Sequence, residues 1–454
     1  MFGRILIANR GEIALRVIRA CRALGIESVA VYSEADRGAP WLARADRAIC
    51  VGPARAEHSY LNAAAILQAA EQTDCHAIHP GYGFLSENAL FAARCVQQGI
   101  AFIGPGPDAI RRMGDKAEAK RTMEAAGLPT IPGSRGTLEG FAEAARLASE
   151  IGYPVLLKAT AGGGGKGMRR CDGEGDLERA FAQASLEAEK AFGNPRLYME
   201  KLIEGGRHVE FQILCDAFGN GVHLCERECS VQRSHQKLIE ESPSPVLDAS
   251  TRKTLGERVA RATAAFGYRN AGTVEFLRAP DGSLYFMEMN TRLQVEHPVT
   301  EMVTGVDLVA EQIRIAALHR LRLAQDEIRP SGHAMEFRVN AEDPDNGFRP
   351  DPGTIADFSP PQSSLPGVVV RWDSAIEAGY RIPPHYDSLV GKLIVHGPDR
   401  RTVLAGARQA LASLRIEGVR TTVPLHLRIL DEAAFRDGSY DLRLLARSGL
   451  VRAV

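Results

Sequence analysis

The stretch from Leu284 to His297, LYFMEMNTRLQVEH, alternates polar and apolar side chains. Successive side chains of an extended chain point to opposite faces, so the pattern predicts a β-strand with one polar and one mostly apolar face. The alternation is expected to stop after Thr291, where the chain turns. The polar positions are Glu288, Asn290, Arg292, Gln294 and Glu296, and the apolar ones are Tyr285, Met287, Met289, Leu293 and Val295. The polar set suits a metal ion and an oxyanion, although a solvated antiparallel strand has the same pattern.

A second strand is expected just upstream, at Gly272 to Arg278. The residues between the two strands, APDG at Ala279 to Gly282, are typical of a turn, so the pair is predicted to form a β-hairpin. Glu275 then lies opposite Glu288 or one step diagonal to it on the same face. Two adjacent carboxylates repel each other unless a cation lies between them, and Mg²⁺ shared with a nucleotide phosphate is the expected cation.

The beginning of the chain alternates between apolar strands and helices with a period of 3.6 residues. This order predicts a small parallel α/β domain that ends near Met113. The loop HPGYGFLSEN, His79 to Asn88, follows a strand and precedes a helix, where such sheets bind ligands, but it is equally consistent with a structural loop. No GxGxxG motif follows the first strand, which disfavours an ordinary dinucleotide-binding fold. The expected elements are strands at 4–8, 28–32, 77–79 and 101–103 and helices at 11–24, 62–71 and 88–98.

Helices are expected at 115–126, 138–151 and from about 176 to 192, and a glycine-rich loop lies between them in Tyr153 to Cys171. Gly167 follows Lys166 where a P-loop requires Ser or Thr, and no helix begins at the loop, so neither a P-loop nor a Rossmann loop is predicted. The remaining interpretation is a strand–loop–strand flap whose amides and Lys166 close over phosphates, with a flexible surface turn as the alternative. Lys158, just before the loop, is expected to point inward toward an anion.

Three segments follow the flap. Leu197 to Gly205 is apolar enough to line a base pocket, and Arg207 to Leu214 alternates so that His208, Glu210 and Gln212 share one face. Cys225 to Pro243 is expected to be irregular. Its cations are Arg227, Arg233, His235 and Lys237. They fit the binding of a small anion, but a solvated charged loop explains them about as well.

Composition narrows the possibilities. The chain of 454 residues is too long for one ordinary core and is expected to form about three domains. Lys and Arg number 55 against 56 Asp and Glu, so nothing points to nucleic acid or an anionic membrane. The N-terminus lacks a signal peptide, no long apolar run occurs, and eight cysteines form no CxxC pair; a cytoplasmic protein with reduced thiols is expected. The spacing of His223, Cys225 and Cys229 fits no common zinc site.

Seven motifs taken together resemble biotin carboxylase, a member of the ATP-grasp superfamily. The similarity extends from Met1 to about Leu430, in order and without large gaps. The motifs are IANRGEIALR, HPGYGFLSEN, MGDK, KATAGGGGKGM, RHVEFQ, the span ending in HQK, and EMNTRLQVEHPVTE. The resemblance implies a fold of mixed α/β and α+β class with three parts: an N-terminal Rossmann-like pre-ATP-grasp domain at 1–113, an ATP-grasp domain at 114–330 with a mobile flap at about 131–203, and a C-terminal biotin carboxylase domain at 331–446.

The resemblance also implies a role for individual residues. Those that would bind ATP are Lys116, Lys158, Gly164, Gly165, Lys166, Glu200, Lys201, Leu202, Ile203, His208, Gln232, His235, Glu275, Leu277 and Glu288. Those that would hold Mg²⁺, with Mn²⁺ as an alternative, are Glu275, Glu288 and Asn290. Those that would bind bicarbonate are Lys237, Arg292, Gln294, Val295 and Glu296. Those that would contact biotin are Tyr82 and Arg338, and those expected to be catalytic are Glu296, Arg292, Arg338 and Lys237.

The implied reaction is the ATP-dependent carboxylation of biotin through carboxyphosphate, with Glu296 as the base. The local sequence agrees with a contact between Arg338 and biotin. The segment HAMEFRVN, His333 to Asn340, alternates polar and apolar residues and places the arginine on a polar strand face. The departures from the family pattern are small: Ala161 replaces a common glycine and Lys166 a common arginine. Neither is expected to prevent phosphate binding, although Ala161 adopts positive φ less readily than glycine and so affects flap mobility.

No lysine lies between two methionines, so biotin is expected to arrive on a separate biotin carboxyl carrier protein. The family then implies a homodimer that acts with carboxyltransferase subunits in acetyl-CoA carboxylase, the enzyme that forms malonyl-CoA for fatty acid synthesis. Pyruvate, propionyl-CoA and urea-type carboxylases use similar subunits and remain alternatives. So do another ATP-grasp ligase, which the site residues disfavour, and a non-catalytic paralogue, although no metal or base residue is missing.

Overall fold

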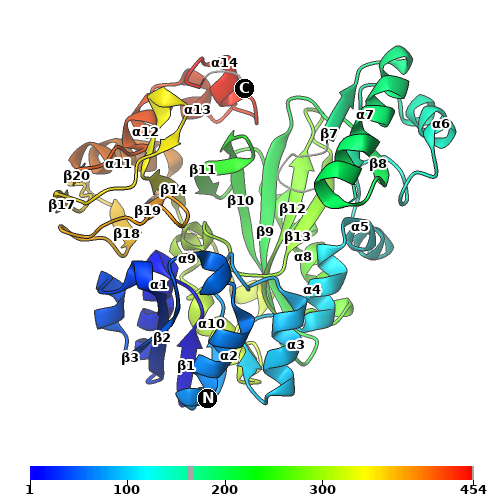
Figure 1. Cartoon of the computed structure of the whole chain (residues 1–454). Helices are drawn as coiled ribbons and strands as arrows, with labels where there is room; N and C mark the ends of the chain where they lie inside the picture. The colour runs from blue at the N-terminus through cyan, green and yellow to red at the C-terminus, as the bar shows by residue number, and fades with distance from the viewer. Residues whose placement is uncertain (161–167, 452–454) are drawn as a thin grey trace.

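The computed structural model describes residues 1–160 and 168–451, and its first part is the predicted parallel α/β unit (Figure 1). The strand order is β3-β2-β1-β4-β5, with all pairs parallel. The strands are β1 (Arg4–Ile7), β2 (Glu27–Ser33), β3 (Arg47–Gly52), β4 (Ala77–His79) and β5 (Ala101–Phe102). β3 has no counterpart among the expected strands, because most of its side chains are exposed or half-buried at the sheet edge and its apolar pattern is weak.

Helices cover both faces of this sheet. On one face α1 (Gly11–Ala23) packs together with α10 (Leu308–Ala316), a helix from much later in the chain. On the other face lie α2 (Ala63–Gln72) and α3 (Ala89–Gln97). Asn62 and Asn88 cap α2 and α3 by accepting a hydrogen bond from a first-turn amide, which explains where these helices begin.

The next part forms a separate lobe that contains the predicted flap. α4 (Pro107–Gly114) and α5 (Lys116–Ala125) lead to it. Its sheet has the antiparallel order β7-β6-β8, with β6 (Val155–Ala159), β7 (Met168–Cys171) and β8 (Leu197–Lys201). α6 (Phe141–Ile151) and α7 (Glu174–Phe192) pack on this sheet and give the lobe its own core. The predicted strand–loop–strand order is confirmed; the glycine loop at 161–167 lies outside the described residues.

An antiparallel sheet of eight strands occupies the centre of the molecule, in the order β13-β12-β9-β10-β11-β14-β19-β18 (Figure 1). It passes without a break from the central part of the chain into the C-terminal part. Its strands are β9 (Arg207–Cys215), β10 (Gly221–Arg233), β11 (Gln236–Ser242), β12 (Asn270–Arg278), β13 (Leu284–Asn290), β14 (His333–Asn340), β18 (Val369–Ser374) and β19 (Leu389–Gly397). The helices α8 (Ala249–Ala265) and α9 (His297–Thr304) pack against it.

Two expectations about this sheet are wrong. Cys225 to Pro243 is not irregular, because β10 and β11 pair antiparallel through most of it. The strict alternation expected from Leu284 also fails early: Phe286 and Met289 are buried, whereas Met287 is 40% exposed. The register between β12 and β13 shifts at Met287, so this residue is the extra one of a β-bulge. The bulge lets Phe286 enter the core while Glu288 still faces Glu275.

The C-terminal part completes the fold. Its core lies between β14, β19 and the helices that follow. Short strand pairs, β15 (Glu342–Asp343) with β16 (Arg349–Pro350) and β17 (Asp357–Ser359) with β20 (Arg415–Glu417), lie beside the main sheet. The helices are α11 (Arg400–Ser413), α12 (Val423–Ile429), α13 (Ala433–Asp437) and α14 (Leu444–Arg447). None of the helices in the described part of the chain has the length and apolarity needed to cross a bilayer.

Candidate active site

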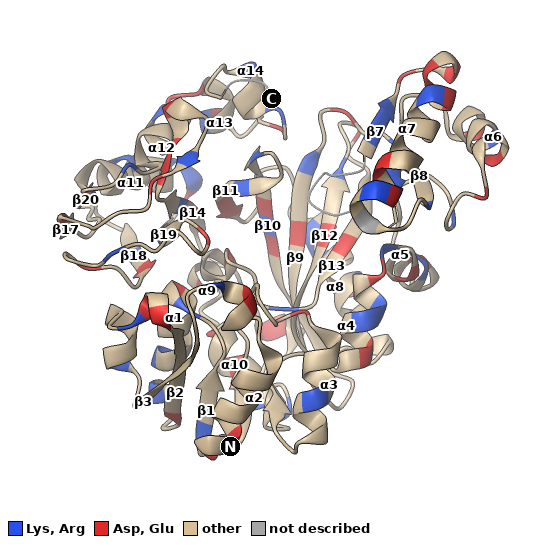
Figure 2. Ribbon diagram, viewed as in Figure 1, with Lys and Arg blue, Asp and Glu red and all other residues tan. Residues whose placement is uncertain are grey.

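A cleft of about 1620 Å³ lies between the N-terminal unit, the β6–β8 lobe and the central sheet. Acidic and basic residues occur together along the central strands β9, β10 and β12, although these strands are interior (Figure 2). Unpaired charges of this kind are costly to bury. These buried charges must therefore be paired with each other or with a bound ligand.

Glu275 and Glu288 face each other directly across the β12–β13 hairpin, as the sequence predicts. The side-chain amide of Asn290 donates to Glu275 Oε1 over 2.8 Å. Burial and the Glu275 charge raise the pKa of Glu288. Two carboxylates and an amide oxygen are hard oxygen ligands, so the three side chains fit a divalent cation such as Mg²⁺.

Lys237 lies among three buried carboxylates. Its Nζ donates to Glu210 Oε2 over 2.6 Å, to Glu296 Oε1 over 2.7 Å and to Glu275 Oε1 over 3.1 Å. Burial alone would lower the pKa of Lys237, but the carboxylates raise it well above its usual value. The lysine is therefore charged, and it is the cation that balances the acidic residues at the floor of the cleft.

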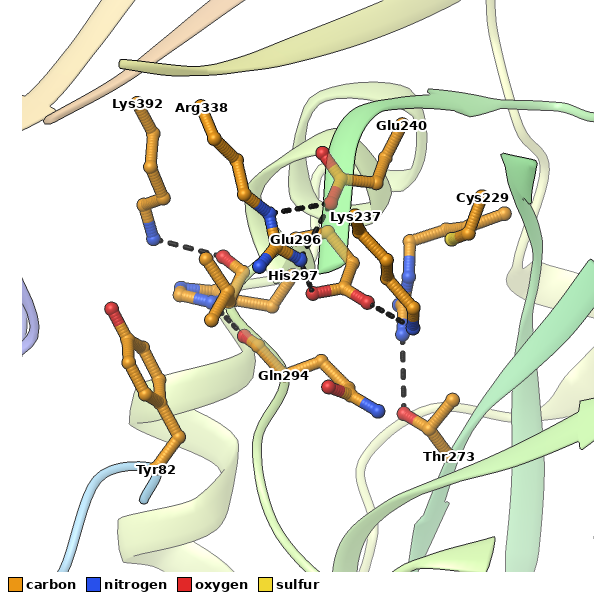
Figure 3. Close-up of polar contacts among 12 residues, drawn as sticks. Tyr82, Cys229, Lys237, Glu240, Thr273, Gln294, Glu296, His297, Arg338 and Lys392 are labelled. Atoms are coloured by element: carbon orange, nitrogen blue, oxygen red, sulfur yellow. Dashed lines mark hydrogen bonds and ion pairs between the residues drawn. The ribbon is translucent and has the colours of Figure 1, made fainter. Parts of the chain in front are cut away.

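Glu296 immediately precedes α9 and has no exposed surface. One of its oxygens accepts from Lys237 and the other from Arg338 Nη2 over 2.8 Å, as Figure 3 shows. Burial tends to raise the pKa of Glu296, but the charges of Lys237 and Arg338 hold it below its usual value. Arg338 also donates from Nε to Glu240 Oε1 over 2.6 Å, a contact that the sequence did not predict.

The loop after β13 presents Arg292 at the cleft. Its guanidinium donates to Glu87 Oε2 over 2.8 Å, to Gln294 Oε1 over 3.0 Å and to Asn290 Oδ1 over 3.1 Å. Glu87 belongs to the loop HPGYGFLSEN, and its other oxygen accepts from the Thr291 amide over 2.9 Å. That loop therefore contacts the arginine that the resemblance assigns to bicarbonate.

A group of cations lies where the lobe meets the sheet. Lys158 donates to Glu200 on β8, as expected of a lysine that points inward. Lys120, which was not among the predicted residues, donates to the other oxygen of Glu200 over 3.3 Å. His208 Nε2 lies 3.2 Å from Glu275 Oε2. Burial lowers the pKa of His208, but Glu275 more than reverses this and raises it to about 9, so the imidazole is a cation at neutral pH.

Family models cover the chain in three consecutive matches. "Biotin carboxylase, N-terminal domain" matches residues 1–110, "Carbamoyl-phosphate synthase L chain, ATP binding domain" matches 115–324, and "Biotin carboxylase C-terminal domain" matches 336–447. The chain belongs to the biotin carboxylase family. It is accordingly an ATP-dependent ligase that carboxylates biotin with ATP and bicarbonate, and its cofactor set is ATP with Mg²⁺.

Individual relatives agree with the family models. The "Biotin carboxylase" of Nostoc sp. is 55% identical, over 96% of this chain and 97% of its own. A pyruvate carboxylase subunit of Methanothermobacter thermautotrophicus is 51% identical, over 96% of this chain and 88% of its own. The biotin carboxylase domain of 2-oxoglutarate carboxylase from Hydrogenobacter thermophilus has a TM-score of 0.92 at 50% identity, with full coverage of both chains. That structure is a dimer in complex with MgADP, ADP and bicarbonate.

Most residues expected from biotin carboxylases meet in one cleft. Its lining includes Tyr82, Lys116, Lys158, Glu200, His208, Gln232, His235, Lys237, Glu275, Leu277, Glu288, Asn290, Arg292, Gln294, Val295 and Arg338. Four expected residues are not in the lining: Glu296, Lys201, Leu202 and Ile203. Glu296 is behind Lys237 and Arg338, and Lys201 points away, donating to Tyr153 O over 2.8 Å. Three more lie outside the described residues: Gly164, Gly165 and Lys166.

The four cations of the segment once expected to be irregular have different positions. His235 and Lys237 line the cleft. Arg233 stacks on Phe348, 4.2 Å from the ring centre, outside the cleft. Arg227 is fully buried and bonds only within the protein: it donates to Glu210, Gln212, Thr300 and Thr273 over 2.7, 2.8, 3.0 and 3.1 Å. The four therefore do not form one anion site, since only two of them reach the cleft.

Proposed function

We propose that this chain catalyses the first half-reaction of acetyl-CoA carboxylase, in which biotin on a separate biotin carboxyl carrier protein is carboxylated. Carboxyltransferase subunits would then use the carboxybiotin to form malonyl-CoA for fatty acid synthesis. The name of the Nostoc relative, "Biotin carboxylase", supports the half-reaction at 55% identity. The choice of acetyl-CoA carboxylase rests on the family resemblance.

The observation that carries the chemical proposal is the placement of Glu296 between Lys237 and Arg338 at the floor of the cleft. Bicarbonate is held by Lys237, Arg292, Gln294 and the Val295 backbone. Glu296 removes its proton, and the oxyanion attacks the γ-phosphoryl group of ATP to give carboxyphosphate and ADP. As in other phosphoryl transfers, the protein contributes mainly position and charge neutralisation.

The nucleotide lies between the lobe and the central sheet in this proposal. The side chains of Lys116, Lys158, His208 and His235 neutralise its phosphates, and the segment Glu200 to Ile203 borders the adenine. Glu275, Glu288 and Asn290 would hold Mg²⁺, which would supply positive charge beside the phosphates. The β6–β8 lobe closes over the nucleotide and excludes water.

Biotin occupies the side of the cleft formed by Tyr82 and Arg338. Carboxyphosphate breaks down to CO₂ and phosphate, and the phosphate accepts the proton from the ureido nitrogen of biotin. Arg338 stabilises the oxyanion that develops on the ureido oxygen, because a preorganised cation in a buried site stabilises charge more than water does.

A 2-oxo acid carboxylase is the second candidate. The specific observation in its favour is the similarity to the pyruvate carboxylase relative from Methanothermobacter and to the 2-oxoglutarate carboxylase domain, at 51% and 50% identity. The choice between the candidates depends on the carboxyltransferase, because that partner binds the acceptor.

Two measurements test the proposal. ADP release by the purified chain with Mg·ATP and bicarbonate should increase strongly when free biotin is added; no increase, with ATP still bound, would contradict the half-reaction. The chain is then combined with its cognate biotinylated carrier and carboxyltransferase. Malonyl-CoA from acetyl-CoA supports the acetyl-CoA carboxylase, whereas carboxylation of pyruvate or 2-oxoglutarate supports the second candidate.

We further propose a homodimer located in the cytoplasm, with domains at 1–113, 114–330 and 331–446. The dimer of the Hydrogenobacter relative supports the first point. The separate core of the β6–β8 lobe supports a flap at about 131–203 that moves as a unit. Neither nucleic acid nor a membrane is expected as a partner.

A further inference from the structure

One face of the central sheet carries four charged residues on three neighbouring strands, directly behind the catalytic groups. Glu240 on β11 pairs with Glu336 on β14, and Arg338 on β14 pairs with Lys392 on β19. Since side chains two residues apart share a face, all four point to the same side. Glu240, Glu336 and Lys392 have no exposed surface. Figure 3 shows Glu240 and Glu296 on either side of the Arg338 guanidinium, with Lys392 nearby.

The two glutamates differ in their contacts. Glu240 accepts from Arg338 Nε over 2.6 Å. Neither oxygen of Glu336 has a hydrogen-bond partner within the part of the chain that the structure describes. Two buried carboxylates directly opposite each other in a sheet repel, so the pair retains a proton. Glu336, which lacks a cation of its own, is where the proton resides.

The charges around the pair agree with this assignment. Glu240 faces Arg338 and Glu336 on β14, Glu296 at the start of α9 and Lys237 on its own strand; Glu336 additionally faces Lys392 on β19. Burial raises the pKa of Glu336 well above its usual value. Burial also raises the pKa of Glu240, but Arg338 opposes this and it reaches only about 7. Lys392 is already paired, with Glu12 Oε1 at 3.1 Å and with the Val295 carbonyl at 2.9 Å.

The reaction changes the contacts of Arg338. When Glu296 takes the proton of bicarbonate, its contact with Arg338 loses the attraction between two opposite charges and weakens. The oxyanion on biotin develops after this step, when Arg338 must keep its position. Among the described residues, Glu240 is the only other carboxylate that contacts the Arg338 side chain.

We propose that Glu240 is a positioning residue that holds the Arg338 guanidinium in place while Glu296 is protonated, with Glu336 remaining a neutral acid opposite it. The inference rests on the proposed role of Arg338 toward biotin. It assigns the three buried glutamates different functions: Glu296 gains and loses a proton, Glu240 stays bonded to Arg338, and Glu336 remains uncharged.

The test compares Glu240→Gln with Glu336→Gln, since both remove one carboxyl group from the same cross-strand pair. Glu240→Gln should lower kcat/KM for free biotin by about 100-fold, the usual effect of displacing a catalytic group by about 1 Å. The KM for ATP and the ADP release measured without biotin should change less than about threefold, because Glu275, Glu288 and Lys237 are untouched. Glu336→Gln replaces one neutral group by another of the same shape, so kcat/KM for biotin should stay within about threefold of wild type.

Glu240→Asp provides the rescue, since a shorter carboxylate keeps the charge and should recover at least about tenfold of the lost activity. Thermal unfolding with and without ATP shows whether Glu240→Gln is folded. If it is not, Glu240→Asp replaces it as the variant that tests the inference. Equal losses for Glu240→Gln and Glu336→Gln, equal losses toward ATP and biotin, or no benefit from aspartate would each overturn the inference. A wild-type chain whose ADP release does not respond to biotin would instead overturn the proposed function, and the inference with it.

Discussion

Replacing Glu296 by glutamine separates catalysis from nucleotide binding, because the residue contacts the two catalytic cations but does not line the cleft. Glutamine has nearly the same shape and no basic oxygen at neutral pH. General-base catalysis typically contributes about 10²–10⁴-fold, so biotin-dependent kcat is expected to fall by at least about 100-fold. The metal and phosphate ligands are unchanged, and the dissociation constant for Mg·ATP should stay within about threefold of wild type.

The substitution also has a stability cost that the structure lets us estimate. Glu296 accepts two charge-assisted hydrogen bonds, from Lys237 and Arg338. The amide oxygen can keep one of them, whereas the amide NH₂ faces the other cation, so about one such bond is lost, or about 1.5–3 kcal/mol. Lys237 retains Glu210 and Glu275 as partners, which limits the damage.

The assay measures ADP release at saturating ATP, bicarbonate and biotin, nucleotide affinity by calorimetry without bicarbonate, and the free energy of unfolding in urea. Glu311→Gln is the matched control: this buried glutamate lies on α10 with Arg314 as its partner and does not line the cleft. The control should lose a comparable stability and keep its kcat. Nucleotide affinity that falls more than about tenfold for Glu296→Gln, with kcat reduced less than tenfold, would refute the role of Glu296 as the base.

Three further substitutions test the structure away from that residue. Arg227→Met should cost about 3–5 kcal/mol of unfolding free energy in urea because it breaks a buried ion pair and leaves Glu210 Oε1 and Gln212 Oε1 without their buried donor. Arg233→Met, half-exposed on the same strand, should cost under about 1 kcal/mol. Burial alone would raise the pKa of Glu241, but hydrogen bonds and ion pairs with His333 and an arginine lower it to about 2. The ionised Glu241 therefore stabilises the fold by about 3 kcal/mol above pH 4.5, and this contribution is lost as the pH falls toward 2. The loss of unfolding free energy in Glu241→Gln, measured in urea, should shrink over the same pH range. A methyl group at Gly133 would meet a backbone oxygen of β8 at 2.2 Å, so Gly133→Ala should cost about 1–3 kcal/mol of unfolding free energy in urea, unlike Gly136→Ala, where the added atom meets nothing within 4 Å.

The sequence was sufficient for those parts of the site in which local pattern decides the geometry. The turn residues at Ala279 to Gly282 set the hairpin, and the hairpin brings Glu275 opposite Glu288. The first α/β unit was predictable for the same reason, since its buried strands are short apolar runs and its helices have apolar residues at helical spacing. The edge strand β3, with mostly exposed side chains, offered no such pattern.

Contacts between distant segments were not predictable from one sequence. Glu87 fixes Arg292 from a separation of 205 residues, and Glu240 contacts Arg338 from a separation of 98. Glu87 lies in the loop HPGYGFLSEN, but neither that motif nor the sequence around Glu240 indicates which distant arginine the glutamate contacts. The same difficulty explains the error at Cys225 to Pro243, where charged side chains suggested a loop. In the structure most of this segment lies in β10 and β11, and charged side chains such as Arg227 are buried there because cation and carboxylate meet across strands.

These buried pairs also bear on how a glutamate with a lowered pKa can act as a base. The cation that contributes most to lowering the pKa of Glu296 is Lys237, which divides its hydrogen bonds among Glu296, Glu210 and Glu275. Bicarbonate bound to Lys237 takes part of that charge away from Glu296. We therefore expect the pKa of Glu296 to rise when bicarbonate is bound, so that the base becomes stronger where its substrate is present. Between catalytic cycles, the pairs with Lys237 and Arg338 keep Glu296 ionised, which avoids an unpartnered buried carboxylate.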